Sequence, residues 1–146
     1  MPRKPDLAQQ IQNRVAANRR ASAFVREDFL GLGGYDQVGR ALRKLVRNGA
    51  LVRVGYGIYA KARRSTVTGK PVPTRPLISV ATEGLRKLGY KVSPSAAAVA
   101  YREGRSTQIP ASQAINLEGR RISRAIRFGH DKITYETAQS LRRKAP

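Results

Sequence analysis

Residues 35–61 read YDQVGRALRKLVRNGALVRVGYGIYAK, and their first half has the pattern of an amphipathic helix. We expect this helix over Asp36–Asn48, with Asp36 as its N-cap and Gly49 in the left-handed conformation that ends a helix. At about 100° per residue, apolar side chains gather on one face and polar and basic ones on the other. The members of the polar face are Gln37, Arg40, Arg43, Lys44 and Arg47. An ordinary helix with a solvated basic face would show the same pattern.

The second half of the stretch predicts a β-hairpin. Residues 51–54 and 58–61 are short β-prone runs, and Gly55-Tyr56-Gly57 between them has hairpin length. A hairpin directly after a helix is typical of a winged helix-turn-helix, in which the helix enters the DNA major groove and the wing contacts the backbone. Tyr59 is expected to pack inward. The predicted wing and backbone contacts are Arg53, Tyr56, Lys61, Arg63 and Arg64.

Two further helices are expected upstream of this stretch. Apolar residues recur at helical spacing between Pro5 and Arg20, and residues 24–30 read as a short second helix that ends at Gly31. With the helix and hairpin described above, they complete a winged-helix DNA-binding domain over residues 1–61.

The rest of the chain is divided by a change in composition. Residues 62–76 lack periodicity and are rich in proline and basic residues, which is typical of a linker. Residues 77–136 start with two helical patterns, up to Arg102, and continue with short strand-length runs. We expect an α+β fold here, with two helices and a short antiparallel meander, followed by a basic tail over residues 137–146.

The net charge favours a polyanionic partner. The 146 residues include 29 Lys and Arg against 9 Asp and Glu, a formal charge of +20. Residues 1–76 carry 16 basic and 4 acidic residues, a net +12, and residues 77–146 carry 13 and 5, a net +8. Because the charge is spread over the chain, a basic tail does not explain it. Double-stranded DNA is the first partner to consider, and a membrane surface is a weaker alternative.

Several classes of protein are disfavoured by what the sequence lacks. It has no cysteine, which excludes disulfides, thiol catalysis and cysteine-based zinc sites and fits a reducing cytoplasm. It has no stretch of about 18 apolar residues for crossing a bilayer and no signal-peptide core. We therefore expect a soluble, cytoplasmic protein without a membrane partner.

Enzyme activity is not expected either. The one histidine, His130, lies beside Asp131 in a predicted turn, where solvent exposure is the ordinary outcome. No phosphate-binding GxxxxGK[ST] loop occurs, and the carboxylates are scattered rather than clustered for metal binding. We expect no catalytic residue, metal or cofactor.

Two parts of the chain resemble a known family. Residues 34–59, from Gly34 to Tyr59, look like the N-terminal winged helix of AbiEi-like antitoxins of type IV toxin-antitoxin systems. The blocks SPSAAA (93–98) and STQIPA (106–111) resemble the start of the C-terminal domain of that family. The resemblance implies an autorepressing DNA-binding regulator that pairs with a nucleotidyltransferase-like toxin, here through residues 77–136. The family's C-terminal domain is larger than the one in this chain.

Other functions stay open at this stage. A charge of +20 is equally natural for an RNA-binding or ribosome-associated winged-helix protein. A module that binds a toxin without recognising specific DNA is a further alternative. The sequence determines neither the operator nor whether the protein is a monomer or a dimer.

Overall fold

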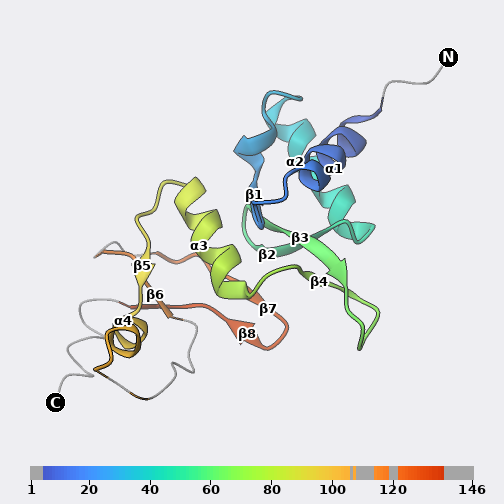
Figure 1. The fold of residues 1–146 in the computed structure, drawn as a ribbon. Helices are drawn as coiled ribbons and strands as arrows, with labels where there is room; N and C mark the ends of the chain where they lie inside the picture. The colour runs from blue at the N-terminus through green and yellow to red at the C-terminus, as the bar shows by residue number, and fades with distance from the viewer. Residues whose placement is uncertain (1–4, 106, 108–113, 119–121, 137–146) are drawn as a thin grey trace.

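The computed structural model describes residues 5–105, 107, 114–118 and 122–136, and its fold is mixed α+β (Figure 1). The helices are α1 (Leu7–Ala17), the 3-10 helix η1 (Arg26–Phe29), α2 (Tyr35–Arg47), α3 (Leu77–Lys87) and α4 (Ala96–Arg102). The strands are β1 (Ala23–Val25), β2 (Leu51–Gly55), β3 (Ile58–Arg64), β4 (Pro71–Pro73), β5 (Ser93–Pro94), β6 (Ala114–Asn116), β7 (Arg127–Phe128), β8 (Asp131–Lys132) and β9 (Thr134–Glu136). The α+β class predicted from the sequence is confirmed.

Helix α2 and the hairpin after it lie close to where the sequence predicts them. The helix begins at Tyr35, so the prediction of Asp36 as N-cap is wrong: Gly34 is the N-cap, and its N–H donates to the Gln37 side chain (3.1 Å). This bond caps the helix at Gly34, so Asp36 lies within the first turn. Gly49 has the predicted left-handed backbone, with φ of +84°.

The short helix predicted over residues 24–30 is wrong for its first part. Ala23–Val25 forms β1, which pairs antiparallel with Ile58–Ala60 of β3, and only the 3-10 helix η1 follows. Pairing with a strand more than thirty residues away overrides the local helical pattern, because backbone bonding and burial outweigh propensity.

A sheet of order β1-β3-β2 separates two hydrophobic clusters. Side chains alternate along each strand: Tyr59 points to the cluster of α1 and α2, whereas its neighbours Ile58 and Ala60 belong to the cluster of α3 and the C-terminal strands. Tyr59 is buried, as predicted. Figure 1 shows α1 and α2 on one side of this sheet and α3 on the other. The hairpin of β2 and β3 is therefore covered on both faces.

Close contact between α3 and the sheet depends on a glycine. A Cβ at Gly84 would lie 2.7 Å from Cγ2 of Ile58, a distance at which atoms overlap. The helix can approach β3 because this position has no side chain. The N-terminal and C-terminal parts of the chain thus share a core, while the domain boundaries drawn from the sequence stay a prediction.

Residues 62–76, predicted to be a linker, contain regular structure. Strand β3 continues to Arg64, and β4 pairs antiparallel with residues 62–64. Pro71 and Pro73 are compatible with this strand, since proline is tolerated at the edge of a sheet, where a missing N–H costs little.

The C-terminal part is not the antiparallel meander that the sequence predicts. Strand β6 pairs antiparallel with β5 but parallel with β9, and β7 pairs with β8 in a separate hairpin. The two helices are present as α3 and α4, and Ser95 caps α4 by accepting from the Ala98 N–H (3.1 Å). Some of the short runs predicted as strands after Arg102, and the whole basic tail over residues 137–146, lie outside the described residues.

Candidate nucleic-acid interface

Helix α2 presents the polar face that the sequence predicts. Val38, Leu42 and Leu45 are buried against α1 and the sheet, and these contacts fix the orientation of the helix. All five predicted side chains of the opposite face are exposed: Gln37, Arg40, Arg43, Lys44 and Arg47. The helix therefore has one face for the core and one face available to a ligand.

Two members of this face have partners within the chain. The Gln37 side chain accepts from the Gly34 N–H and so belongs to the helix cap. Lys44 forms an ion pair with Asp6, with Nζ 3.2 Å from Oδ2. Asp6 also caps α1 by accepting from the Gln9 N–H (2.8 Å). This backbone bond, and then the bond from Lys44, lower the pKa of the Asp6 carboxyl.

The tip of the β2–β3 hairpin brings Arg53 and Tyr56 together. Tyr56 is 69% exposed, and the Arg53 guanidinium carbon lies 5.9 Å from the centre of its ring. A cation within about 6 Å of an aromatic face is attracted to the ring. The predicted pair thus forms one exposed basic and aromatic cluster.

The sequence prediction missed Arg124, the third member of this cluster. Its Nη1 donates to the Tyr56 carbonyl, and its guanidinium carbon lies 5.8 Å from the Tyr56 ring centre. A bridge between Gly55 and Ile126 holds the two segments together. No local pattern could have identified Arg124, because the contact joins residues 68 positions apart.

The backbone of Arg124 is fixed from the other side by Tyr135. The Tyr135 hydroxyl donates to the Arg124 carbonyl (2.8 Å). Burial of the Tyr135 phenol raises its pKa to about 12, although the positive charge of Arg124 opposes the shift. Tyr135 is therefore protonated at neutral pH and able to donate this bond.

The remaining predicted wing residues do not lie at this tip. Lys61 donates from Nζ to the Asn18 carbonyl (3.2 Å), at the end of α1. Arg63 and Arg64 are exposed at the far end of β3, about 20 Å from Tyr56 at about 3.3 Å per residue. The five residues predicted to act together therefore occupy different regions of the surface.

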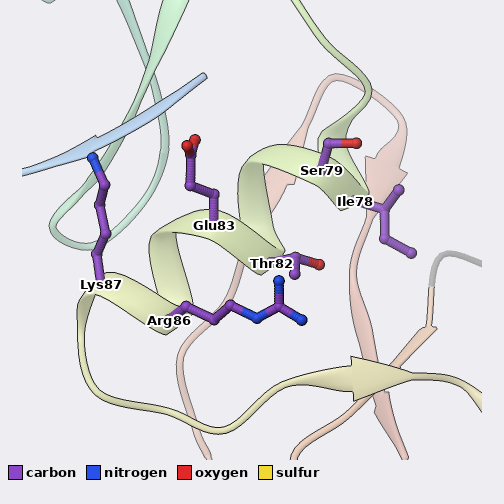
Figure 2. A pocket seen from close by; sticks show the side chains of 6 residues that line it. All are labelled: Ile78, Ser79, Thr82, Glu83, Arg86 and Lys87. Carbon is purple, nitrogen blue, oxygen red and sulfur yellow. The ribbon is translucent and has the colours of Figure 1, made fainter. Parts of the chain in front are cut away.

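A hollow of about 650 Å³ lies along α3, lined by Ile78, Ser79, Thr82, Glu83, Arg86 and Lys87 (Figure 2). Figure 2 shows Glu83 and Lys87 pointing toward β1. The Glu83 carboxylate accepts from the Ser22 N–H (2.8 Å) and hydroxyl (3.0 Å) and from the Ala23 N–H.

Lys87 completes the link between α3 and the N-terminal sheet. Its Nζ donates to the Ala23 carbonyl and to Asp28, both at 2.9 Å. Since Glu83 and Lys87 bind β1 and η1 of the same chain, we assign their charges to the attachment of α3.

The described residues do not form a cluster of metal-ligating side chains. No group of three or more His, Asp and Glu side chains in this part of the chain is placed to hold a metal ion. His130 lies exposed in the turn between β7 and β8, as predicted. No helix among the described ranges is long and apolar enough to cross a bilayer.

One segment of the sequence carries basic residues without acidic ones. Residues 37–82 contain ten Lys and Arg and no Asp or Glu. This segment spans nearly all of α2, the β2–β3 and β3–β4 hairpins and the start of α3.

A model of the family of unknown function DUF6088 matches residues 10–142. The chain belongs to this family. No curated protein and no solved structure matches it.

Proposed function

We propose that this member of the DUF6088 family is a DNA-binding transcriptional regulator with an N-terminal winged helix. The order α1-β1-η1-α2-β2-β3 supports the proposal, as does the sheet order β1-β3-β2. In this interpretation α1, η1 and α2 are the three helices, α2 is the recognition helix, and the β2–β3 hairpin is the wing.

The observation that carries the proposal is the exposed face of α2 within an acid-free segment. Arg40, Arg43 and Arg47 are exposed, no acidic residue follows until Glu83, and Asp36 precedes them at the start of the helix. The major groove is about 12 Å wide and admits a helix, and arginine can donate two hydrogen bonds to guanine. Arg40 lies in the second turn of α2 and is our first candidate for base contact.

The cluster of Arg53, Tyr56 and Arg124 at the tip of the proposed wing has a different role from that of α2. Arg53 is exposed beside Tyr56, where its guanidinium group can bind a phosphate, and the half-buried Arg124 holds the tip through the Tyr56 carbonyl. Contacts to phosphate give affinity and orientation but do not distinguish sequences. We infer that the cluster positions α2 on the duplex.

Duplex RNA is the less suitable ligand. The major groove of A-form RNA is deep and narrow, so the face of α2 could not reach base edges.

We further propose that the regulator is an autorepressing antitoxin. This part rests on the resemblance of the sequence over residues 34–59, 93–98 and 106–111 to AbiEi-like antitoxins. The partner would be a nucleotidyltransferase-like toxin bound by residues 77–136. Co-purification of the full chain with the product of the adjacent gene tests this role, and it should persist in Arg40→Ala. Failure of the wild-type chain to bind or neutralise that product would contradict the antitoxin role and leave DNA binding untouched.

Selection from a random duplex library tests DNA recognition directly. The full chain should enrich one sequence motif, and structured RNA should compete poorly with the enriched duplex. Binding should weaken steeply with salt, by about 0.9 in log K per log salt for each phosphate contacted. Enrichment of no motif, or equal competition by RNA, would refute sequence-specific recognition of DNA.

A further inference from the structure

The β3–β4 hairpin extends beyond the rest of the N-terminal sheet. Strands β1 and β2 pair with residues 58–61 of β3, whereas β4 pairs with residues 62–64. Figure 1 shows this hairpin projecting from the body of the molecule. From the Lys61–Thr74 pair to the tip, its reach is about 15 Å at strand spacing.

The loop at its tip is organised by hydrogen bonds. The Ser65 hydroxyl accepts from the N–H groups of Val67 and Thr68, both at 3.2 Å. The Ser65 N–H donates to the Lys70 carbonyl (2.8 Å), and the Gly69 N–H donates to the Ser65 carbonyl (2.9 Å). These bonds hold the loop in one conformation and present Val67, whose exposed fraction is 91%.

The hairpin is basic and is anchored beside the end of α2. Arg63, Arg64 and Lys70 are exposed along it. At the strand pair next to its loop, Arg64–Pro71, Cγ of Pro71 lies 3.1 Å from where a Cβ of Gly49 would be, directly after α2. The position of the hairpin is therefore coupled to that of the proposed recognition helix.

We propose that the β3–β4 hairpin is a second DNA-binding arm that reaches the minor groove next to the major groove occupied by α2. Arg63, Arg64 and Lys70 bind phosphates, and Val67 contacts the groove floor. Arms of this kind combine basic flanks with an apolar tip. The inference rests on the proposed DNA binding.

Methylation protection tests the arm and α2 separately, because dimethyl sulfate modifies guanine N7 in the major groove and adenine N3 in the minor groove. The full chain is bound to its enriched motif flanked by A·T base pairs. Wild type should protect guanines of the motif and adenines of one flank. Val67→Asp should lose the adenine protection and keep the guanine protection.

A double variant tests the phosphate contacts. Arg63→Ala/Arg64→Ala should lower the salt slope by about 2, since each lost phosphate contact removes about 0.9. The matched control is Lys91→Ala/Arg102→Ala, which removes the same charge near β5 and α4, on the side of the molecule opposite β4 in Figure 1. Its slope should stay close to that of wild type.

The possible failures can be told apart. Guanine protection without adenine protection in wild type would overturn the arm and leave the proposed function intact. Equal salt slopes for the two double variants would also overturn the arm. So would an Arg63→Ala/Arg64→Ala variant that loses binding to anionic vesicles but keeps its binding to duplex DNA. Protection of neither base by wild type would overturn both proposals.

Discussion

The Nη1 of Arg124 donates a hydrogen bond to the backbone carbonyl of Tyr56 and so attaches the C-terminal part of the chain to the tip of the β2–β3 hairpin. A wing that extends freely into solvent would lack such an attachment. Here the tip is fixed by this bond and by the Gly55–Ile126 bridge. A ligand of the C-terminal strands could therefore influence the proposed wing through Arg124.

Replacement of Arg124 by alanine should loosen the hairpin tip without unfolding the protein. Loss of a hydrogen bond from a charged donor is worth about 1.5 to 3 kcal/mol. We expect faster amide hydrogen exchange over residues 55–58 and unchanged exchange in α2. Arg127→Ala, at an exposed site in β7, is the control. Equal exchange in the two variants would show that Arg124 does not restrain the tip.

Ionisation of Tyr135 should destabilise the fold at high pH. Its folded-state pKa, raised by burial to about 12, lies above the ordinary value of about 10. The stabilisation is complete below pH 10 and is lost as the pH rises toward 12, because the unfolded chain releases the proton first. An ultraviolet titration should resolve a late tyrosine that is missing in Tyr135→Phe. Identical titration curves would contradict the assignment.

Replacement of Glu83 by alanine should weaken the attachment of α3 to the sheet. The change leaves the N–H groups of Ser22 and Ala23 without their acceptor, and unsatisfied groups of this kind cost about 1 to 3 kcal/mol. Urea unfolding should show a lower midpoint with the same slope. Glu27→Ala, at an exposed position in η1, should leave the midpoint nearly unchanged. A Glu83→Ala midpoint equal to that of wild type would exclude a structural role.

Substitution of Asp6 by asparagine should strengthen DNA binding. Asparagine can still cap α1. The substitution removes the negative charge that pairs with Lys44 on the exposed face of α2, which we propose contacts base edges. Because an exposed ion pair is weak, the gain in affinity should be a few fold and should shrink with salt. Fluorescence anisotropy on a labelled duplex measures it. Binding equal to that of wild type would place Lys44 outside the interface.

The sequence predicted the local features of the fold well. Helix α2, its end at Gly49 and the β2–β3 hairpin follow from periodicity and from glycine, which act over a few residues. The exposed face of α2 could be predicted for the same reason. Asp36 failed as N-cap because the helix is capped two residues earlier, at Gly34, whose N–H donates to the Gln37 side chain.

Features that depend on distant pairing could not be predicted. Residues 23–25 become a strand only because β3 supplies partners, and β4 exists only because β3 continues to Arg64. For the same reason Lys61, Arg63 and Arg64 were grouped with a tip from which the structure separates them. Arg124 was missed because its contact with Tyr56 depends on the packing of the C-terminal part against the hairpin.

The central claim is that α2 reads base sequence, and the dissociation constants of Arg40→Ala on enriched and random duplexes test it most directly. We predict a loss of about 1 to 3 kcal/mol on the enriched duplex, the usual value of a good arginine contact to a base, and almost none on random duplex. Arg63→Ala should weaken binding to both duplexes alike, and Arg102→Ala, exposed on α4, should weaken neither. Equal losses of Arg40→Ala on both duplexes would contradict base reading by α2.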